Sequence, residues 1–343
     1  MFFMNIKCNV WAYLAFCFLM LLGCGGATEN KHIVDVSKVQ AKVTFNRADR
    51  IMTQAKSRDE IIDYLKANIR FAERGLRIQQ YPSEYILVEE LFKVAQSPFV
   101  DTICQKIDKV HGANLENVEK SLLDLFKHTK YYFPEFKEPV VYTVVSGYSP
   151  GNDLILGDSL AIVGLDFYLG AKHSPYRPRI EDVPQYMWRR FAPNTLPLHF
   201  AMQLSTKFAK GDPKDKTLLA SMIDWGKTLY FCQKTNPTLP DSVIIGYTAE
   251  EWKNISLSQE VVWGYFVEKN LFFDQSRDAK IRFIGERPFT SDISEKCPGR
   301  VGAWLGWQIV NAYMENHPET SLKQLMEWSD ARKLFEEAKY RPE

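Results

Sequence analysis

The feature that most constrains this chain is an uncharged apolar run close to its N-terminus. The run extends from Val10 to Leu22 and follows a single positive charge at Lys7. A bilayer-spanning helix needs about 20 apolar residues, whereas the apolar core of a secretory signal has about 7 to 15. We therefore interpret residues 1–23 as a signal peptide that directs the rest of the chain into the cell envelope.

The four residues that end this run fit a bacterial lipobox, Leu21-Leu22-Gly23-Cys24. In a lipobox the cysteine is acylated, for example with palmitate, and becomes the new N-terminus. Each buried methylene of an acyl chain contributes about 0.8 kcal/mol of membrane affinity, so a multiply acylated Cys24 holds the protein on a membrane. Residues 24–33 are small and polar, as expected of a flexible tether.

The tether also bears on the location of the protein. Some bacterial lipoproteins that are displayed on the cell surface carry an acidic cluster just after the cysteine, whereas the only acidic residue in 25–31 is Glu29. We therefore expect the periplasmic face of the outer membrane rather than the cell surface.

Composition narrows the class of protein further. Without Lys7 the 43 basic residues become 42, equal to the 42 acidic residues, so the mature chain is close to neutral. Neutrality argues against nucleic acid as a partner, because binding phosphates requires an excess of positive charge. The 22 Phe, 16 Tyr and 8 Trp indicate a well-packed globule.

The cysteines predict no metal site or disulfide framework. Cys8 and Cys17 leave with the signal, and Cys24 is acylated. Only Cys104, Cys232 and Cys297 then remain, far apart and without a C-x-x-C motif. We predict no cofactor.

The order of patterns predicts an α+β fold that is mostly helical. Capping-box sequences begin helical patterns at Ser57, Thr248 and Ser321, and the first two patterns run to about Gly75 and Asn270. Further helical patterns cover about 85–94 and 115–128, and an extended segment covers 34–49. Runs at 140–146, 154–156 and 160–166 predict a small central sheet of three or so strands. Because no long linker or repeat occurs, we expect residues 34–343 to form a single domain.

Four blocks of sequence and the lipobox carry a family resemblance. The blocks are FKHTKYYFP (126–134), DSLAIVGLDFYLG (158–170), YFVEKNL (265–271) and PGRVGAWLGWQIV (298–310). With them the chain resembles the gliding-motility lipoprotein GldB family of Bacteroidetes. The resemblance implies a role in the cell envelope, connected in gliding relatives with the motility machinery. Gliding itself does not follow, because similar proteins occur in non-gliding relatives.

The last block has a structural interpretation of its own. Gly299, Gly302 and Gly306 have the spacing of one helix face, where missing side chains let another element approach closely. Trp304 and Trp307 lie on other faces. We therefore predict a packing helix that is buried on several sides.

A more distant similarity, to putative zinc peptidases, raises the question of catalysis. Those proteins carry H-E-x-x-H on the helix after the sheet, where two histidines hold zinc and the glutamate activates water. The corresponding stretch here begins at His199 but has Phe200 in place of the glutamate and Gln203 in place of the second histidine. We interpret His199 and Gln203 as the relic of a metal helix in a degenerate zincin-like fold, with no metal and no catalytic residue.

One hydrolase motif also occurs. Gly147-Tyr148-Ser149-Pro150-Gly151 matches G-x-S-x-G, but a nucleophile elbow leads from a strand into a helix, and here a strand-like segment follows. We interpret Ser149 as part of a hairpin turn.

The sequence leaves three functions open. The first is a non-catalytic, lipid-anchored envelope protein that acts through protein partners, which the lipobox, the resemblance and the missing metal residues favour. The second is a hydrolase with an altered zinc-peptidase-like site, which residues distant in sequence, such as Asp158, Asp166 and Asp224, would have to complete. The third is a glycan-binding lipoprotein, suggested only by the many aromatic residues.

Overall fold

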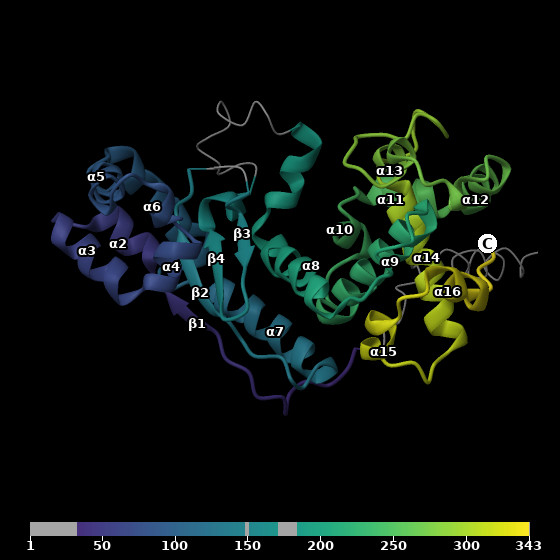
Figure 1. Ribbon diagram of the computed structural model, residues 1–343, viewed down its shortest axis with the longest axis horizontal. Coiled ribbons are helices and arrows are strands. Elements are labelled where there is room, and N and C mark those ends of the chain that lie inside the picture. The colour runs from purple at the N-terminus through teal and green to yellow at the C-terminus, as the bar shows by residue number, and fades with distance from the viewer. Residues whose placement is uncertain (1–32, 148–150, 171–183, 343) are drawn as a thin grey trace, which may run out of the picture. The chain divides into compact units, whose positions relative to one another are not determined.

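The computed structural model describes residues 33–147, 151–170 and 184–342 (Figure 1). The chain divides into two units, Met1–Val34 and Asp35–Glu343. Almost all of the first unit, including the predicted signal segment and Cys24, lies outside the described residues, as does Ser149. In the second unit no described helix is long and apolar enough to cross a membrane.

A four-stranded mixed sheet lies in the described part of this unit, in the order β1-β2-β4-β3. The strands are β1 (Thr44–Asn46), β2 (Val140–Val144), β3 (Leu154–Leu156) and β4 (Leu160–Gly164). The first three in the sheet order are parallel, and β3 pairs antiparallel with β4 at the edge. All five residues of β4 are buried, as expected of a strand covered on both faces.

Alternate residues of the sheet enter two separate apolar cores. Leu160 and Ile162 join the smaller core, which includes side chains of α2 (Ala48–Gln54), α3 (Arg58–Ala67), α4 (Ile69–Arg74) and α5 (Glu84–Ala95). Ala161 and Val163 point into the larger core on the other face. In Figure 1 α2 to α5 lie on the opposite side of the sheet from α7 and α8.

Helices supply most of the larger core. These are α6 (Pro98–His111), α7 (Glu116–Tyr132), α8 (Leu196–Phe208), α9 (Leu218–Thr235), α10 (Asp241–Ile245), α11 (Ala249–Ser256), α12 (Gln259–Glu268), α13 (Arg277–Phe283), α14 (Val301–Asn316), α15 (Leu322–Glu327) and α16 (Ala331–Ala338). The mostly helical α+β prediction is confirmed, with β1 as a strand beyond the three expected.

The predicted helix starts are accurate, but two predicted helices are each divided. Thr248 and Ser321 form complete capping boxes with Glu251 and Gln324. The Ser57 side chain also caps its helix, whereas the Glu60 side chain accepts from the Lys56 amide rather than from Ser57. The pattern after Ser57 breaks at Asn68 into α3 and α4, and the pattern after Thr248 breaks at Leu257–Ser258 into α11 and α12.

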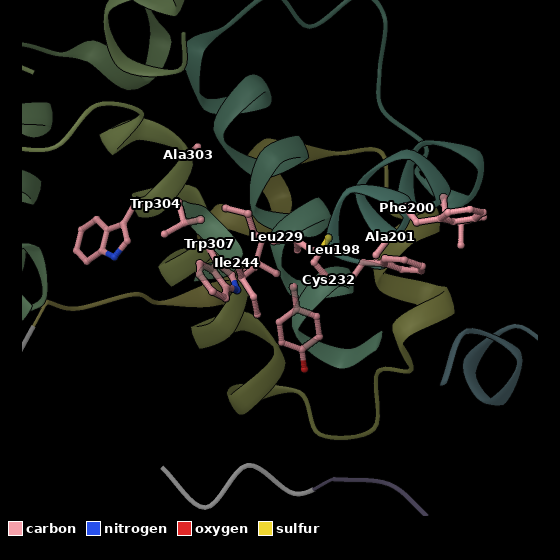
Figure 2. Close-up of a cluster of buried hydrophobic side chains, with 14 of the residues drawn as sticks. Leu198, Phe200, Ala201, Leu229, Cys232, Ile244, Ala303, Trp304 and Trp307 are labelled. Carbon is pink, nitrogen blue, oxygen red and sulfur yellow. The ribbon is translucent and has the colours of Figure 1, made fainter. Parts of the chain in front are cut away.

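The tryptophan-rich helix α14 is the buried packing helix that the sequence predicts. Trp304 and Trp307 are at most 1% exposed, and Figure 2 shows both rings in the apolar cluster with residues of α8, α9 and α10. At the contact with α9, a Cβ on Gly306 would lie 2.0 Å from the Met222 carbonyl oxygen, and one on Gly226 would lie 2.4 Å from the Gly306 carbonyl oxygen. The two backbones therefore touch, which only glycine permits.

The prediction of a shared helix face is wrong for one of the three glycines. Helix α14 begins at Val301 with Arg300 as its N-cap, so Gly299 precedes the helix. Gly302 faces Phe283 at the end of α13, and Gly306 faces α9. Gly299 is constrained separately, since a Cβ there would lie 1.9 Å from the Arg287 carbonyl oxygen.

The hairpin interpretation of the Ser149 segment is also wrong. The strands on either side of it, β2 and β3, are not neighbours, because β4 lies between them. The hairpin is β3–β4 instead, where the Gly157 amide donates to the Leu160 carbonyl oxygen. The expectation that a strand rather than a helix follows Gly151 is confirmed by β3.

Candidate functional site

Helix α8 holds His199, Phe200 and Gln203, the positions that the sequence suggests as the relic of a zinc-peptidase motif. It follows a short 3-10 turn, has a proline in its first turn and packs against β3 and α9. His199 and Gln203 lie one helical turn apart, as predicted. Their side chains have different environments.

The Phe200 and Gln203 positions stabilise the fold. Phe200 is fully buried, and its ring packs edge-on against Phe126 with centroids 5.4 Å apart. Gln203 Nε2 donates to the Leu154 carbonyl oxygen at 2.7 Å, which joins α8 to the edge strand β3. A buried phenyl ring cannot accept a proton from water as the glutamate of the motif would, and the Gln203 amide is already hydrogen-bonded to the backbone.

His199 is the member of the motif that lies at a cavity. It is half-buried, and its Nδ1 lies 3.1 Å from the Tyr168 hydroxyl. Burial, and secondarily the charge of Arg190, lower the pKa of His199 to about 4. The ring is therefore neutral at pH 7, and in the tautomer in which Tyr168 donates to Nδ1 the proton resides on Nε2. Within the described residues, Nε2 has no hydrogen-bond partner.

The cavity has a volume of about 170 Å³, and we call it the basic pocket. Its apolar walls come from α8, α9 and α10, and include Leu198, Met202, Trp225, Val243 and Ile244. Its charged side chains are Arg189, Arg190, Glu286 and Arg300, from segments far apart in the sequence. Pockets for drug-sized ligands are about 300–1,000 Å³, so this one suits a single small chemical group.

Two arginines in the basic pocket share one carboxylate. Arg190 Nη1 donates to Glu286 Oε1 at 2.6 Å, and Arg300 Nε lies 3.4 Å from the same oxygen. Burial raises the pKa of Glu286, but the hydrogen bond from Arg190 and the charge of Arg300 outweigh it, so the net pKa is lowered. Glu286 is therefore ionised at pH 7.

The neighbouring Arg189 uses the corresponding edge of its guanidinium within the protein. Its Nε donates to the Gly246 carbonyl oxygen and its Nη2 to Glu251 Oε2, both at 2.9 Å. Arg190 lies against the same glycine from the side-chain direction: a Cβ at position 246 would lie 2.8 Å from Arg190 Nε. Gly246 also has φ of +84° as the C-cap of α10. Glycine is therefore favoured here both by the close approach of Arg190 and by the left-handed backbone.

The three aspartates considered as distant metal ligands have separate partners. Asp158 is almost fully exposed and pairs with Lys207, and Asp224 pairs with Lys227. Asp166 is buried and accepts hydrogen bonds from Ser146. Among the described residues, no three His, Cys, Asp or Glu side chains are grouped so as to hold a metal ion. The absence of metal in the protein itself stays a prediction.

The sequence interpretation missed the arginines and Glu286. Arg190 and Glu286 are 96 residues apart, and no motif links them. The only available signals were the adjacent Arg189-Arg190 pair and the position of Arg300 between two glycines in the last family block.

Comparison with known proteins gives one match. The sequence model of the family described as "Gliding motility protein GldB" matches residues 29–342, most of the chain. The chain belongs to this gliding-motility family. No curated protein and no solved structure matches it.

Proposed function

We propose that this protein is a lipid-anchored component of the cell envelope that acts by binding a protein partner and has no peptidase activity. Cys24 would provide the anchor, on the periplasmic face of the outer membrane. The observation that carries the proposal is the structural use of α8: Phe200 is in the core, and Gln203 is bonded to β3. Positions that bind zinc and activate water in a peptidase stabilise the fold in this chain.

The anchor can be tested directly by mass spectrometry of the N-terminus. We expect Cys24 to be the first residue and to carry acyl chains, because Leu21, Leu22 and Gly23 present it just after the apolar run. The variant Cys24→Ser should lose the acyl chains and the membrane fraction. A processed N-terminus at another residue would contradict the anchor.

An exposed apolar surface supports the partner-binding role. Leu257 and Val261, at the junction of α11 and α12, are 77% and 65% exposed. They border a groove of about 470 Å³, which also includes Ile293 and Pro298. We propose that an apolar segment of an envelope protein covers this groove, since exposed apolar patches commonly mark interaction sites.

Site-specific photocrosslinking in living cells tests this surface. A crosslinking amino acid at Val261 should give one discrete adduct, and the added substitution Leu257→Glu should abolish it. Ile69 is the matched control, because it is 53% exposed but lies on α4, against the smaller core. The same adduct from Ile69, or none from Val261, would contradict a partner at this groove.

The competing hydrolase function rests on His199, which lines the basic pocket and whose Nε2 has no hydrogen-bond partner among the described residues. Elemental analysis of the purified protein separates the two functions, and we expect far less than one equivalent of zinc, because the described residues offer one imidazole at the motif. Stoichiometric zinc that is lost in His199→Ala, together with a hydrolytic activity, would replace the binding function by the hydrolase.

A further inference from the structure

The charge in the basic pocket is unbalanced. Arg190 and Arg300 contribute two positive charges and Glu286 one negative charge, while Arg189 is paired with Glu251 outside the lining. His199 is neutral at pH 7. Among the described residues, one excess positive charge therefore remains in a small, mostly apolar cavity, where removing a charge from water is costly unless a counter-charge is present.

One edge of the Arg190 guanidinium, which we call the free edge, has no hydrogen-bond acceptor among the described residues. Its Nη1 is bonded to Glu286, but its Nε is buried without a partner, and within the described residues no hydrogen bond uses its Nη2. Nε and Nη2 are the two donors of one edge of the guanidinium, and that edge matches the two oxygens of a carboxylate. Elsewhere in this protein, Arg47 uses the same edge to bind both oxygens of Asp49.

The second arginine is held in place by several elements. Arg300 is 4% exposed, its Nη1 donates to the Ile245 carbonyl oxygen, and its guanidinium lies 4.5 Å above the Trp225 ring. Its backbone has φ of +61°, in the left-handed region that costs a non-glycine residue free energy. The fold thus fixes a positive charge at this place despite the backbone strain.

We propose that the basic pocket binds a carboxylate group from outside the chain. The carboxylate would accept from the free edge of Arg190 and from the Nε2–H of His199. Its aliphatic remainder would contact Leu198, Met202 and Val243. A phosphate group fits less well, because it carries about −1.5 to −2 charge and the pocket has one positive charge to offer.

The first experiment measures binding of small probes to the processed full chain in detergent by isothermal titration calorimetry. Butyrate is the carboxylate probe, and butyramide is its neutral analogue of the same shape. We expect saturable binding of butyrate at one site and at least 10-fold weaker binding of butyramide. Absence of saturable butyrate binding, or equal binding of the amide, would overturn the proposal.

Two further probes distinguish the source of the carboxylate. One is an acetylated tripeptide ending in leucine with a free C-terminus, and the other is the same peptide amidated. Tighter binding of the free peptide than of butyrate identifies the end of a polypeptide as the ligand class. Binding of butyrate without binding of the peptide identifies a small free acid.

Adjacent arginines provide a matched pair of variants. Arg190→Gln removes the free edge and should weaken butyrate binding at least 10-fold. Arg189→Gln removes an equal charge from the same wall, but that arginine is engaged with Gly246 and Glu251, so affinity should change less than about threefold. Thermal melts of both variants check folding, and Arg190→Lys, which keeps the charge but loses the planar edge, should be intermediate. Equal effects of Arg189→Gln and Arg190→Gln would show a general charge effect instead of a site.

Discussion

Two clusters of charged side chains in this protein differ in whether the fold completes them. Near β1 and β2, Asp49 accepts two hydrogen bonds from Arg47 and one from Thr143, at 2.6 to 2.9 Å, and is 1% exposed. Arg50 and Asp108 form a second pair beside it, so positive and negative charges balance. In the basic pocket one guanidinium edge has no acceptor in the part of the chain that the structure describes.

The difference shows how a structural charge cluster can be separated from a binding site. Buried charged and polar groups cost free energy unless they are paired, so a cluster that serves stability alone tends to be closed by its own residues. The Asp49 cluster meets this condition. Within the described residues the basic pocket does not, and Arg190 lines a cavity of about 170 Å³.

The largest expected effect is on stability at the closed cluster. Asp49→Ala would leave the Arg47 edge and the Thr143 hydroxyl without their acceptor, which should lower the free energy of unfolding by about 3–5 kcal/mol. Glu286→Ala in the basic pocket should cost about 1 kcal/mol or less, because Glu286 is 39% exposed. Urea denaturation measures both, with the exposed Asp158→Ala as control. Equal losses at Asp49 and Glu286 would remove the distinction.

Each region also contains a histidine that the fold keeps neutral. Burial lowers the pKa of His111, on α6 one turn from Asp108, to about 4, against a backbone hydrogen bond at Leu165 that raises it. His199 has a pKa of about 4 for the same main reason. Between pH 6.5 and pH 4 these histidines bind protons in the unfolded chain, where their pKa is near 6.5, but stay neutral in the folded chain. The free energy of unfolding should therefore have its full value above pH 6.5 and fall as the pH is lowered toward 4.

Each histidine contributes on the order of 3 kcal/mol to this loss. Denaturation at pH 7 and pH 4.5 measures it, and His111→Gln and His199→Gln should each reduce the difference between the two pH values. An unchanged difference in His111→Gln would mean that this ring is not the buried neutral group described. A ligand carboxylate, if bound, should alter only the contribution of His199.

Helix α9, which lines part of the basic pocket, packs closely against α14, and glycine substitutions test this contact. A Cβ at Gly306 has no room beside Met222, so Gly306→Leu should lower the free energy of unfolding by about 3 kcal/mol. At Gly302 the nearest atom to such a Cβ is 3.0 Å away, so Gly302→Leu should lower the free energy of unfolding by about 1–3 kcal/mol. Gly264 on α12 has no atom within 4 Å of such a Cβ. Gly264→Ala should therefore be neutral or slightly stabilising, and unchanged melting of the Gly306 variant would show that the helices are not in contact.

The smallest effect concerns affinity. Glu286→Gln raises the excess positive charge of the basic pocket from one to two, so butyrate should bind about threefold more tightly or better. At the closed cluster no variant should create butyrate binding. Weaker binding in Glu286→Gln would mean that Glu286 positions the arginines more than it competes with the ligand.

Local signals in the sequence predicted much of the fold. The side chains of Ser57, Thr248 and Ser321 each cap a helix where the sequence places them, because a cap depends on residues three apart. The breaks at Asn68 and at Leu257–Ser258 were missed, since the apolar pattern continues across both. Strand β1 has three residues, too few for an alternating pattern to show.

The candidate site was predicted only in part, for a physical reason. His199 was identified because α8 has a motif spacing to compare. The partners that define its pocket are brought together by tertiary packing: Arg190 by a 3-10 turn, Glu286 by the segment after α13, and Arg300 by the start of α14. No spacing along the chain encodes such a cluster.

The position of β4 has a consequence for the order of events when the chain that we propose to be exported emerges into the envelope. β4 is the last strand to emerge, yet it lies between β2 and β3. Until residue 164 has emerged, β2 can pair only with β1, and its other edge of amides and carbonyls stays open. Open strand edges recruit other chains. A chain that has emerged only as far as residues 144–160 should therefore be the most aggregation-prone form and the best substrate for chaperones.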